Sequence, residues 1–135
     1  RDFSEGEHQF IQENKDRIKT YFDRDIRVRQ YEGETFKQVV AEIIDQLPQK
    51  VFISFDIDGL DPKLCPNTGT PVQGGFETEQ IFYLFNKLRE SGKQLIGFDL
   101  CEVSTSETGW DANVGARVLF KMCNLLVANN RVTYA

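Results

Sequence analysis

The residues of this chain best suited to chemistry are aspartates that follow one another at spacings of two and three positions. They lie in residues 54–62, which read SFDIDGLDP, directly after an apolar run that begins at Val51. Side chains alternate along a strand, so Asp56 and Asp58 point to the same side. Two carboxylates this close repel each other unless a cation compensates them, and the segment contains no basic residue. The pattern therefore indicates a site for a hard divalent cation.

Other interpretations of the aspartate segment remain. The aspartates could cap a solvated turn, but a buried strand before them and a long loop after them favour a metal site. An EF-hand loop requires Gly at its sixth position and Glu at its twelfth, where this chain has Asp61 and Asn67. Aspartyl-phosphate hydrolases of the haloacid dehalogenase type have Thr or Val two residues beyond the second aspartate. Leu60 lies there in this chain, which argues against that class but leaves it open.

Alternating helices and strands are expected to position the aspartate segment. In the clearest helix, residues 35–47, apolar side chains recur on one face of a helix, and Pro48 ends it. A loop rich in Gly and Pro is expected at 59–75, between the aspartates and the next helix. We expect helices at residues 5–16, 35–47, 78–90 and 111–127, and strands at 18–22, 51–55 and 95–100.

This alternation predicts an α/β protein of three layers, in which helices cover both faces of a parallel sheet. Ligands of such sheets bind beyond the carboxyl ends of the strands. The polar residues of this sequence lie there: the aspartates follow the strand at 51–55, and Glu102 follows the strand at 95–100.

Composition limits the partners and the compartment. The 135 residues suffice for one domain, and a net charge of −5 argues against nucleic acid or an anionic membrane as a partner. The sequence has no signal-peptide pattern and no run of about 18 apolar residues that would span a membrane. Cys65, Cys101 and Cys123 form no CxxC pair, so we expect neither a disulfide framework nor a structural zinc site, and a cytoplasmic location.

The aspartate segment and the loop after it resemble the signature of the ureohydrolases, the superfamily of arginase, agmatinase and formimidoylglutamase. In that family SFDxDxxDP is followed, after a short spacer, by PGTGTPxxGG. Residues 66–71 here read PNTGTP and precede Gly74-Gly75, with Asn67 in place of the commoner small residue. Residues 97–104, GFDLCEVS, are similar to the family's D-x-x-E-V-(N/S)-P, although Thr105 replaces the proline. The resemblance implies the C-terminal part of the arginase/deacetylase-like fold.

The resemblance also implies a reaction and a set of residues for it. In ureohydrolases two Mn²⁺ ions share a bridging hydroxide, which attacks the carbon of a guanidinium or formimidoyl group. Asp56 and Asp58 would be metal ligands, and Thr70 would line the site. Glu102 would pair with the planar cation of the substrate, because two carboxylate oxygens match two guanidinium N–H groups. The implied partner is a small guanidino or formimidoyl substrate. Further copies of the same chain are also expected as partners, because loss of the upstream part of the sheet would expose a strand edge and an apolar surface.

The family's other metal ligands come from a Gly-Gly-Asp-His and an Asp-Ala-His-x-Asp segment, and this sequence contains neither. Its only histidine, His8, lies in a polar stretch where we expect it to be exposed. We therefore expect residues 1–135 to be the C-terminal part of a single ureohydrolase-like domain whose upstream part is absent. The whole protein would be a manganese-dependent hydrolase of linear amidines, and the chain alone would be inactive. The alternative is a non-catalytic fragment, or a degenerate family member with a structural or assembly role.

Overall fold

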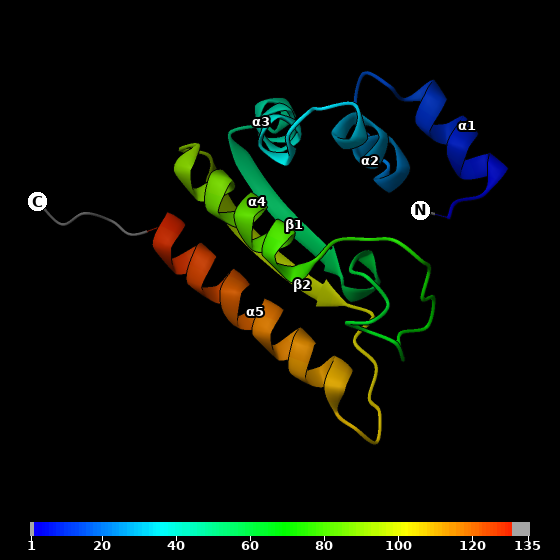
Figure 1. Ribbon diagram of the computed structural model, residues 1–135. Coiled ribbons are helices and arrows are strands. Elements are labelled where there is room, and N and C mark those ends of the chain that lie inside the picture. Colours follow the sequence, from blue (N-terminus) through cyan, green and yellow to red (C-terminus); the bar gives the residue numbers. More distant parts are fainter. Residues whose placement is uncertain (1, 131–135) are drawn as a thin grey trace, which may run out of the picture.

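Two parallel strands and five α-helices make up residues 2–130, the part of the chain that this computed structural model describes (Figure 1). The strands are β1 (Lys50–Asp56) and β2 (Gln94–Cys101), and a short 3₁₀ turn (Ile57–Gly59) follows β1. The helices are α1 (Glu5–Glu13), α2 (Asp23–Tyr31), α3 (Phe36–Gln46), α4 (Thr78–Glu90) and α5 (Trp110–Asn129). Within residues 2–130, no helix combines the length and the apolar character needed to cross a membrane.

The register of the sheet places the ends of both strands side by side. Lys50 pairs with Gln94 and Asp56 with Cys101, with one bulge between Val51 and Phe52. Both strands run in the same direction, so Asp56 and the residue after Cys101, Glu102, leave the sheet at the same edge. The fold thereby brings the two predicted acidic positions together.

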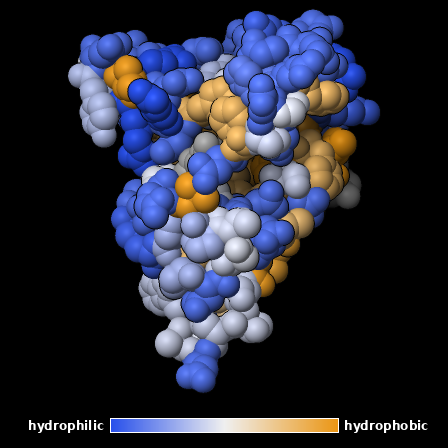
Figure 2. Space-filling view, turned by 90° about the vertical axis from the view of Figure 1, so that its right-hand side faces the viewer, coloured by the Kyte–Doolittle hydropathy of each residue, from blue (hydrophilic) through white to orange (hydrophobic). Residues whose placement is uncertain are grey.

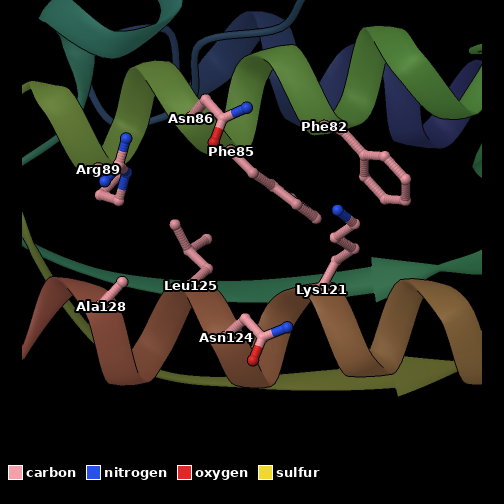
Figure 3. Close-up of a pocket in the computed structure, with 8 residues that line it drawn as sticks. All are labelled: Phe82, Phe85, Asn86, Arg89, Lys121, Asn124, Leu125 and Ala128. Carbon is pink, nitrogen blue, oxygen red and sulfur yellow. The ribbon is translucent and has the colours of Figure 1, made fainter.

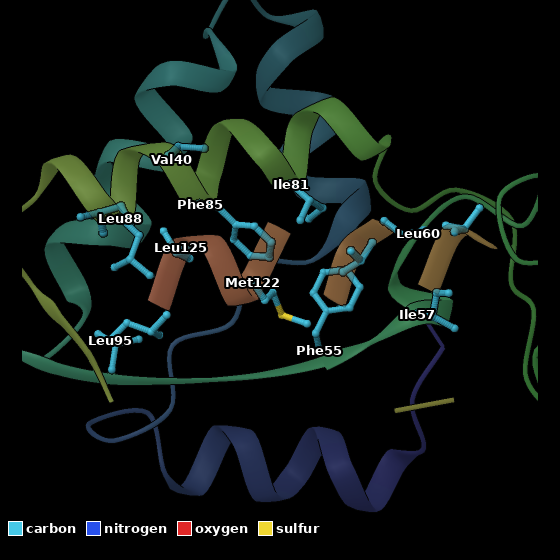
Figure 4. Packing of buried hydrophobic residues seen from close by; sticks show 14 of the residues in the cluster. Val40, Phe55, Ile57, Leu60, Ile81, Phe85, Leu88, Leu95, Met122 and Leu125 are labelled. Carbon is cyan, nitrogen blue, oxygen red and sulfur yellow. The ribbon is translucent and has the colours of Figure 1, made fainter. Parts of the chain in front are cut away.

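The core lies on one face of the sheet, under α3, α4 and α5 (Figure 4). Val51 and Phe55 point into it from alternate positions of β1, and apolar stripes on the three helices meet them. Asn129 and Asn130, at the end of α5, bond with the backbone of Leu95 through their side chains, and so fix this end of the helix to the start of β2. The core residues labelled in Figure 4 are Val40, Phe55, Ile57, Leu60, Ile81, Phe85, Leu88, Leu95, Met122 and Leu125.

The second face of the sheet is exposed. Phe52 and Ile96 are 54% and 56% exposed, and Ser54 and Asp99 also lie at the surface. The α/β class and the parallel sheet are confirmed. Helices were predicted on both faces, whereas among residues 2–130 the packed helices α3, α4 and α5 cover one, and α1 buries none of its residues.

The region before α3 differs most from the prediction. The strand expected at residues 18–22 is wrong, because this segment forms an irregular connection, and Phe22 precedes α2 and stacks on Phe3. The helix α2 was not predicted, because its sequence DRDIRVRQY has no apolar stripe and buries only Ile26. Its arginines form ion pairs at the surface, including those of Arg29 with Glu34 and Glu42.

Two neighbouring residues of β2 test the one-sided core. Leu95 is fully buried and Ile96 is 56% exposed. We expect Leu95→Ala to lower the free energy of unfolding by about 2–5 kcal/mol, because it leaves a cavity. Ile96→Ala should cost about 1 kcal/mol or less, since it removes an exposed side chain of a strand. Urea unfolding followed by circular dichroism measures both, and equal losses would contradict the one-sided core.

Candidate metal centre

Asp56 and Asp58, the two aspartates of the candidate centre, lie where β1 ends and the 3₁₀ turn begins. Phe55 and Ile57 point into the core, and Ile57 is fully buried. Asp56 is exposed and Asp58 is partly exposed, so both carboxylates lie outside the core, as the alternation predicted. The buried Ile57 packs the 3₁₀ turn against the core, so that the side chains of its neighbours Asp56 and Asp58 point away from the core.

The loop after the turn closes on itself and returns Thr70 to the aspartates. Its ends are joined by two backbone hydrogen bonds, from Asp61 N–H to Phe76 C=O (3.0 Å) and from Phe76 N–H to Gly59 C=O (3.1 Å). Between these ends, Thr70 Oγ1 donates to Asp58 Oδ2 over 2.6 Å. Thr70 therefore contacts a predicted metal-binding carboxylate directly, where it was expected to line the site.

Asp56, Asp58 and Thr70 line one hollow of about 640 Å³ at this edge of the sheet. Figure 2 views the molecule from this side and shows the surface hollowed, with hydrophobic as well as hydrophilic residues around the hollow. Ser54 lines the hollow from β1, and Asp2 reaches it from the start of the chain. No local pattern in the sequence marks Asp2, which comes to the hollow through the course of the chain before α1.

Glu102 lies at the end of β2, beside the same loop but outside the lining of the hollow. Its backbone has a φ of 63°, in the left-handed region that a glutamate rarely adopts. Its carbonyl accepts a hydrogen bond from Thr68 Oγ1 over 3.0 Å. Its carboxylate lies next to Gly69, with Oε2 3.6 Å from the place where a Cβ of that residue would be. The predicted substrate-binding glutamate and the predicted metal ligand Asp58 thus contact the same short loop segment, residues 68–70.

This edge of the sheet is strongly negative. Within residues 2–130, Asp56, Asp58 and Glu102 make no ion pair with Lys, Arg or His. These negative charges act on Cys101, which pairs with Asp56 in the sheet. Desolvation is the main cause that raises the pKa of the Cys101 thiol above its ordinary value. Neighbouring carboxylates raise that pKa further, those of Asp99, Asp56 and Glu102.

The donor chemistry suits a hard cation. Carboxylate oxygens are ligands that Mn²⁺ accepts readily, and Asp56 and Asp58 offer theirs from one turn of the chain. Among the residues that the structure describes, no three side chains of His, Cys, Asp or Glu gather as a complete metal-binding group. The two carboxylates, with Thr70 bonded to one of them, are what residues 2–130 contribute to such a centre.

Other acidic residues near the candidate centre make structural hydrogen bonds. Asp61 accepts a hydrogen bond from Lys63 N–H and braces the loop, and Asp99 accepts one from Ser54 Oγ. His8 is exposed, as expected. Asp111 lies in the first turn of α5, whose N-cap is Gly109. It accepts two hydrogen bonds from Asn67, in the loop, and so anchors this end of the helix.

A second surface groove lies between α4 and α5, away from the carboxylates (Figure 3). Its volume is about 200 Å³, it shares no residue with the acidic hollow, and no carboxylate lines it. It therefore lacks the carboxylate ligands that the acidic hollow offers to a hard cation. The residues around it are Phe82, Phe85, Asn86, Arg89, Lys121, Asn124, Leu125 and Ala128.

Comparisons with known proteins agree with the geometry. The profile of the Arginase family matches residues 1–124. A guanidinobutyrase from Pseudomonas aeruginosa is 38% identical over 96 residues, 69% of this chain and 30% of that protein. An agmatinase from Proteus mirabilis is 38% identical over 91 residues, 66% of this chain and 28% of that protein. Arginase from Bacillus caldovelox superposes with a TM-score of 0.72 at 27% identity, covering 98% of this chain and 42% of that one. The chain thus spans less than half the length of these relatives.

The raised pKa of Cys101 can be tested in the metal-free protein. Alkylating agents react with the thiolate, so a raised pKa moves the increase in reaction rate to higher pH. Asp99→Asn removes a negative charge beside the thiol and should move the midpoint of the rate profile to lower pH. Ser54→Ala removes only a hydrogen bond to Asp99 and is the control. Mass spectrometry of the Cys101 peptide after iodoacetamide pulses at several pH values measures the rates. An unchanged midpoint in Asp99→Asn would contradict the acidic field.

Proposed function

The chain belongs to the arginase family, and we propose that the full-length protein is a manganese-dependent ureohydrolase that hydrolyses the C–N bond of a linear amidine or guanidino compound. The observation that carries this proposal is the hydrogen bond from Thr70 to Asp58 at the edge where β1 and β2 end. It joins two separate parts of the matched signature around one acidic hollow. Relatives named as an agmatinase and a guanidinobutyrase support the same reaction class.

Asp56 and Asp58 would hold manganese in this proposal. Both present carboxylate oxygens at the end of β1, and neither forms an ion pair within the described chain. When bound, manganese supplies Lewis acidity that makes water a nucleophile near neutral pH. We propose that the remaining ligands belong to parts of the full-length protein outside residues 1–135, since the relatives are more than twice as long.

Thr70 orients one of the two ligands. Its hydroxyl hydrogen goes to Asp58 Oδ2, which limits the rotation of that carboxylate and leaves its other oxygen available. Partners of this kind, which bind a ligand rather than the metal, set the affinity and the geometry of metal sites. The lone pairs of Thr70 Oγ1 remain available to accept a hydrogen bond within the hollow.

Glu102 would bind the planar cation of the substrate. A carboxylate can accept two parallel N–H bonds from a guanidinium or amidinium group, and the position of Glu102, directly after the strand that pairs with β1, supports this role. Its charge would hold the group to be hydrolysed next to the hollow that Asp56 and Asp58 line. Urea, or formamide from a formimidoyl substrate, and an amine would be the products.

The proposal extends to the state of the chain. Alone, residues 1–135 would bind manganese weakly and would not turn over.

The exposed Phe52 and Ile96 support the proposal that the rest of the full-length protein covers the second face of the sheet, and that the protein forms a homo-oligomer. The three cysteines form no disulfide among the described residues, which fits a location in the reducing cytoplasm.

The activity of the full-length protein tests the reaction class. With added Mn²⁺, we expect release of urea or formamide from one of arginine, agmatine and formimidoylglutamate. Asp58→Asn should lower both the manganese content and the activity, by about 100-fold or more in activity. Glu102→Gln should raise KM by about tenfold or more while manganese is retained, because it removes the charge that binds the substrate cation. Asp16→Asn, at an exposed position far from the site, is the control.

A wild-type protein that binds manganese but hydrolyses none of the three substrates would contradict the proposed reaction class. That result would favour the alternative, a non-catalytic family member with a role in structure or assembly.

The role of Thr70 has its own matched pair of variants. Thr70→Val keeps the shape of the side chain but loses the hydroxyl that donates to Asp58. We expect about a 10- to 100-fold loss in manganese affinity, measured by titration of the full-length protein. Thr70→Ser keeps the hydroxyl and should stay close to wild type. A loss in Thr70→Ser with none in Thr70→Val would mean that the methyl group, and not the hydrogen bond, matters.

A further inference from the structure

One short segment of the loop, residues 67–70, is bonded to three different parts of the fold. Asn67 donates twice to Asp111 of α5, from its backbone N–H (2.9 Å, to Oδ2) and from its side-chain amide (2.8 Å, to Oδ1). Thr68 Oγ1 donates to the carbonyl of Glu102, after β2. Thr70 Oγ1 donates to Asp58, after β1. The segment thus connects α5 and the ends of both strands.

Burial shows that these bonds are fixed parts of the structure. In residues 2–130 the buried polar and charged residues are Thr68, which is 5% exposed, and Asp111, which is fully buried. A buried hydroxyl or carboxylate is tolerated only when its hydrogen bonds are made, and both residues make theirs within this network. Release of segment 67–70 would leave the Asp111 carboxylate buried without its partners.

The backbone of Glu102 needs such a restraint. It is the residue other than glycine with a positive φ, 63°, among those that the structure describes. A side-chain-bearing residue stays in that conformation only when its surroundings hold it there. Thr68 binds the carbonyl of this same residue, so the hydroxyl fixes the peptide plane that determines where the Glu102 side chain starts.

We propose that residues 67–70 act as a positioning clamp, which sets the place of the Glu102 carboxylate relative to the carboxylates of Asp56 and Asp58. Thr68 is the positioning residue for Glu102, and Asp111 anchors the clamp on α5. The proposal rests on the proposed function in one respect, namely that Glu102 binds the cation of the substrate. Through the clamp, the metal-binding side and the substrate-binding side of the site keep a fixed separation although they follow different strands.

Kinetics of the full-length protein with Mn²⁺ test the effect on Glu102, using whichever of arginine, agmatine and formimidoylglutamate it hydrolyses. Thr68→Val removes the hydroxyl and should raise KM by about tenfold with the manganese content unchanged, because the misplaced Glu102 binds the cation poorly. Thr68→Ser keeps the hydroxyl and should restore the wild-type KM. Thr105→Val changes an exposed threonine three residues after Glu102 and is the control. A purely structural role of Thr68 would instead lower the manganese content and kcat together and leave KM unchanged.

Hydrogen exchange tests the clamp without any activity. In the full-length protein, Thr68→Val and Asp111→Asn should both increase deuterium uptake in peptides that cover residues 59–75 and 97–106. Asp111→Asn acts because an amide offers one acceptor oxygen where Asn67 needs two. Thr68→Ser and Thr105→Val should leave uptake as in wild type.

The two measurements separate the possible failures. Unchanged exchange in Thr68→Val and Asp111→Asn would overturn the clamp. Faster exchange with an unchanged KM would overturn the positioning of Glu102. Failure of the wild-type protein to hydrolyse any of the substrates would overturn the proposed function, while the exchange experiment would still decide whether the clamp exists.

Discussion

Parallel strands in register end at the same edge of a sheet, and the pairing of Asp56 with Cys101 makes β1 and β2 end together. The relative positions of Asp58 and Glu102 depend on that pairing, because Asp58 follows one strand and Glu102 follows the other. The pairing in turn depends on the helices that bury a single face of the sheet, and α5 contributes at both of its ends. Asn129 and Asn130 bond with β2 where the strand begins, and Asp111 bonds with the loop beyond its end. A helix fixed at two points along a strand holds the edge of the sheet in place.

The site accumulates negative charge that the described chain does not neutralise. Several acidic side chains elsewhere form ion pairs: Asp23 pairs with Arg27, Glu34 and Glu42 with Arg29, and Glu90 with Lys87. At the edge of the sheet, hydrogen bonds from hydroxyl groups replace ion pairs, from Ser54 to Asp99 and from Thr70 to Asp58. Hydroxyl groups orient carboxylates without cancelling their charge, which is the arrangement expected where a cation is to bind.

Much of this organisation could be predicted from the sequence, and the limits have physical causes. The helix predicted at 35–47 appears as α3 because its apolar stripe and Pro48 act locally, and β1 and β2 appear because short apolar runs lie between turn-forming residues. The helix α2 was missed because its sequence has no apolar stripe and buries only Ile26. Asp56, Asp58 and Thr70 were identified by motif, and the hollow brings them together. The bonds of Asp111 and Thr68 join residues 44 and 34 positions apart, a separation at which no periodicity in the sequence reports contact.

The closure of the loop at Gly59, Asp61 and Phe76 has a consequence for how this site can vary. Because the two ends of the loop are bonded to each other, its far arm around Gln73, which is exposed, can change length without shifting the register of β1 or the start of α4. The loop residues near Gln73 can thus change without a change in β1 or α4. The part of the loop around Gln73 can therefore vary in length and side chains while segment 67–70 and the carboxylates bonded to it keep their places.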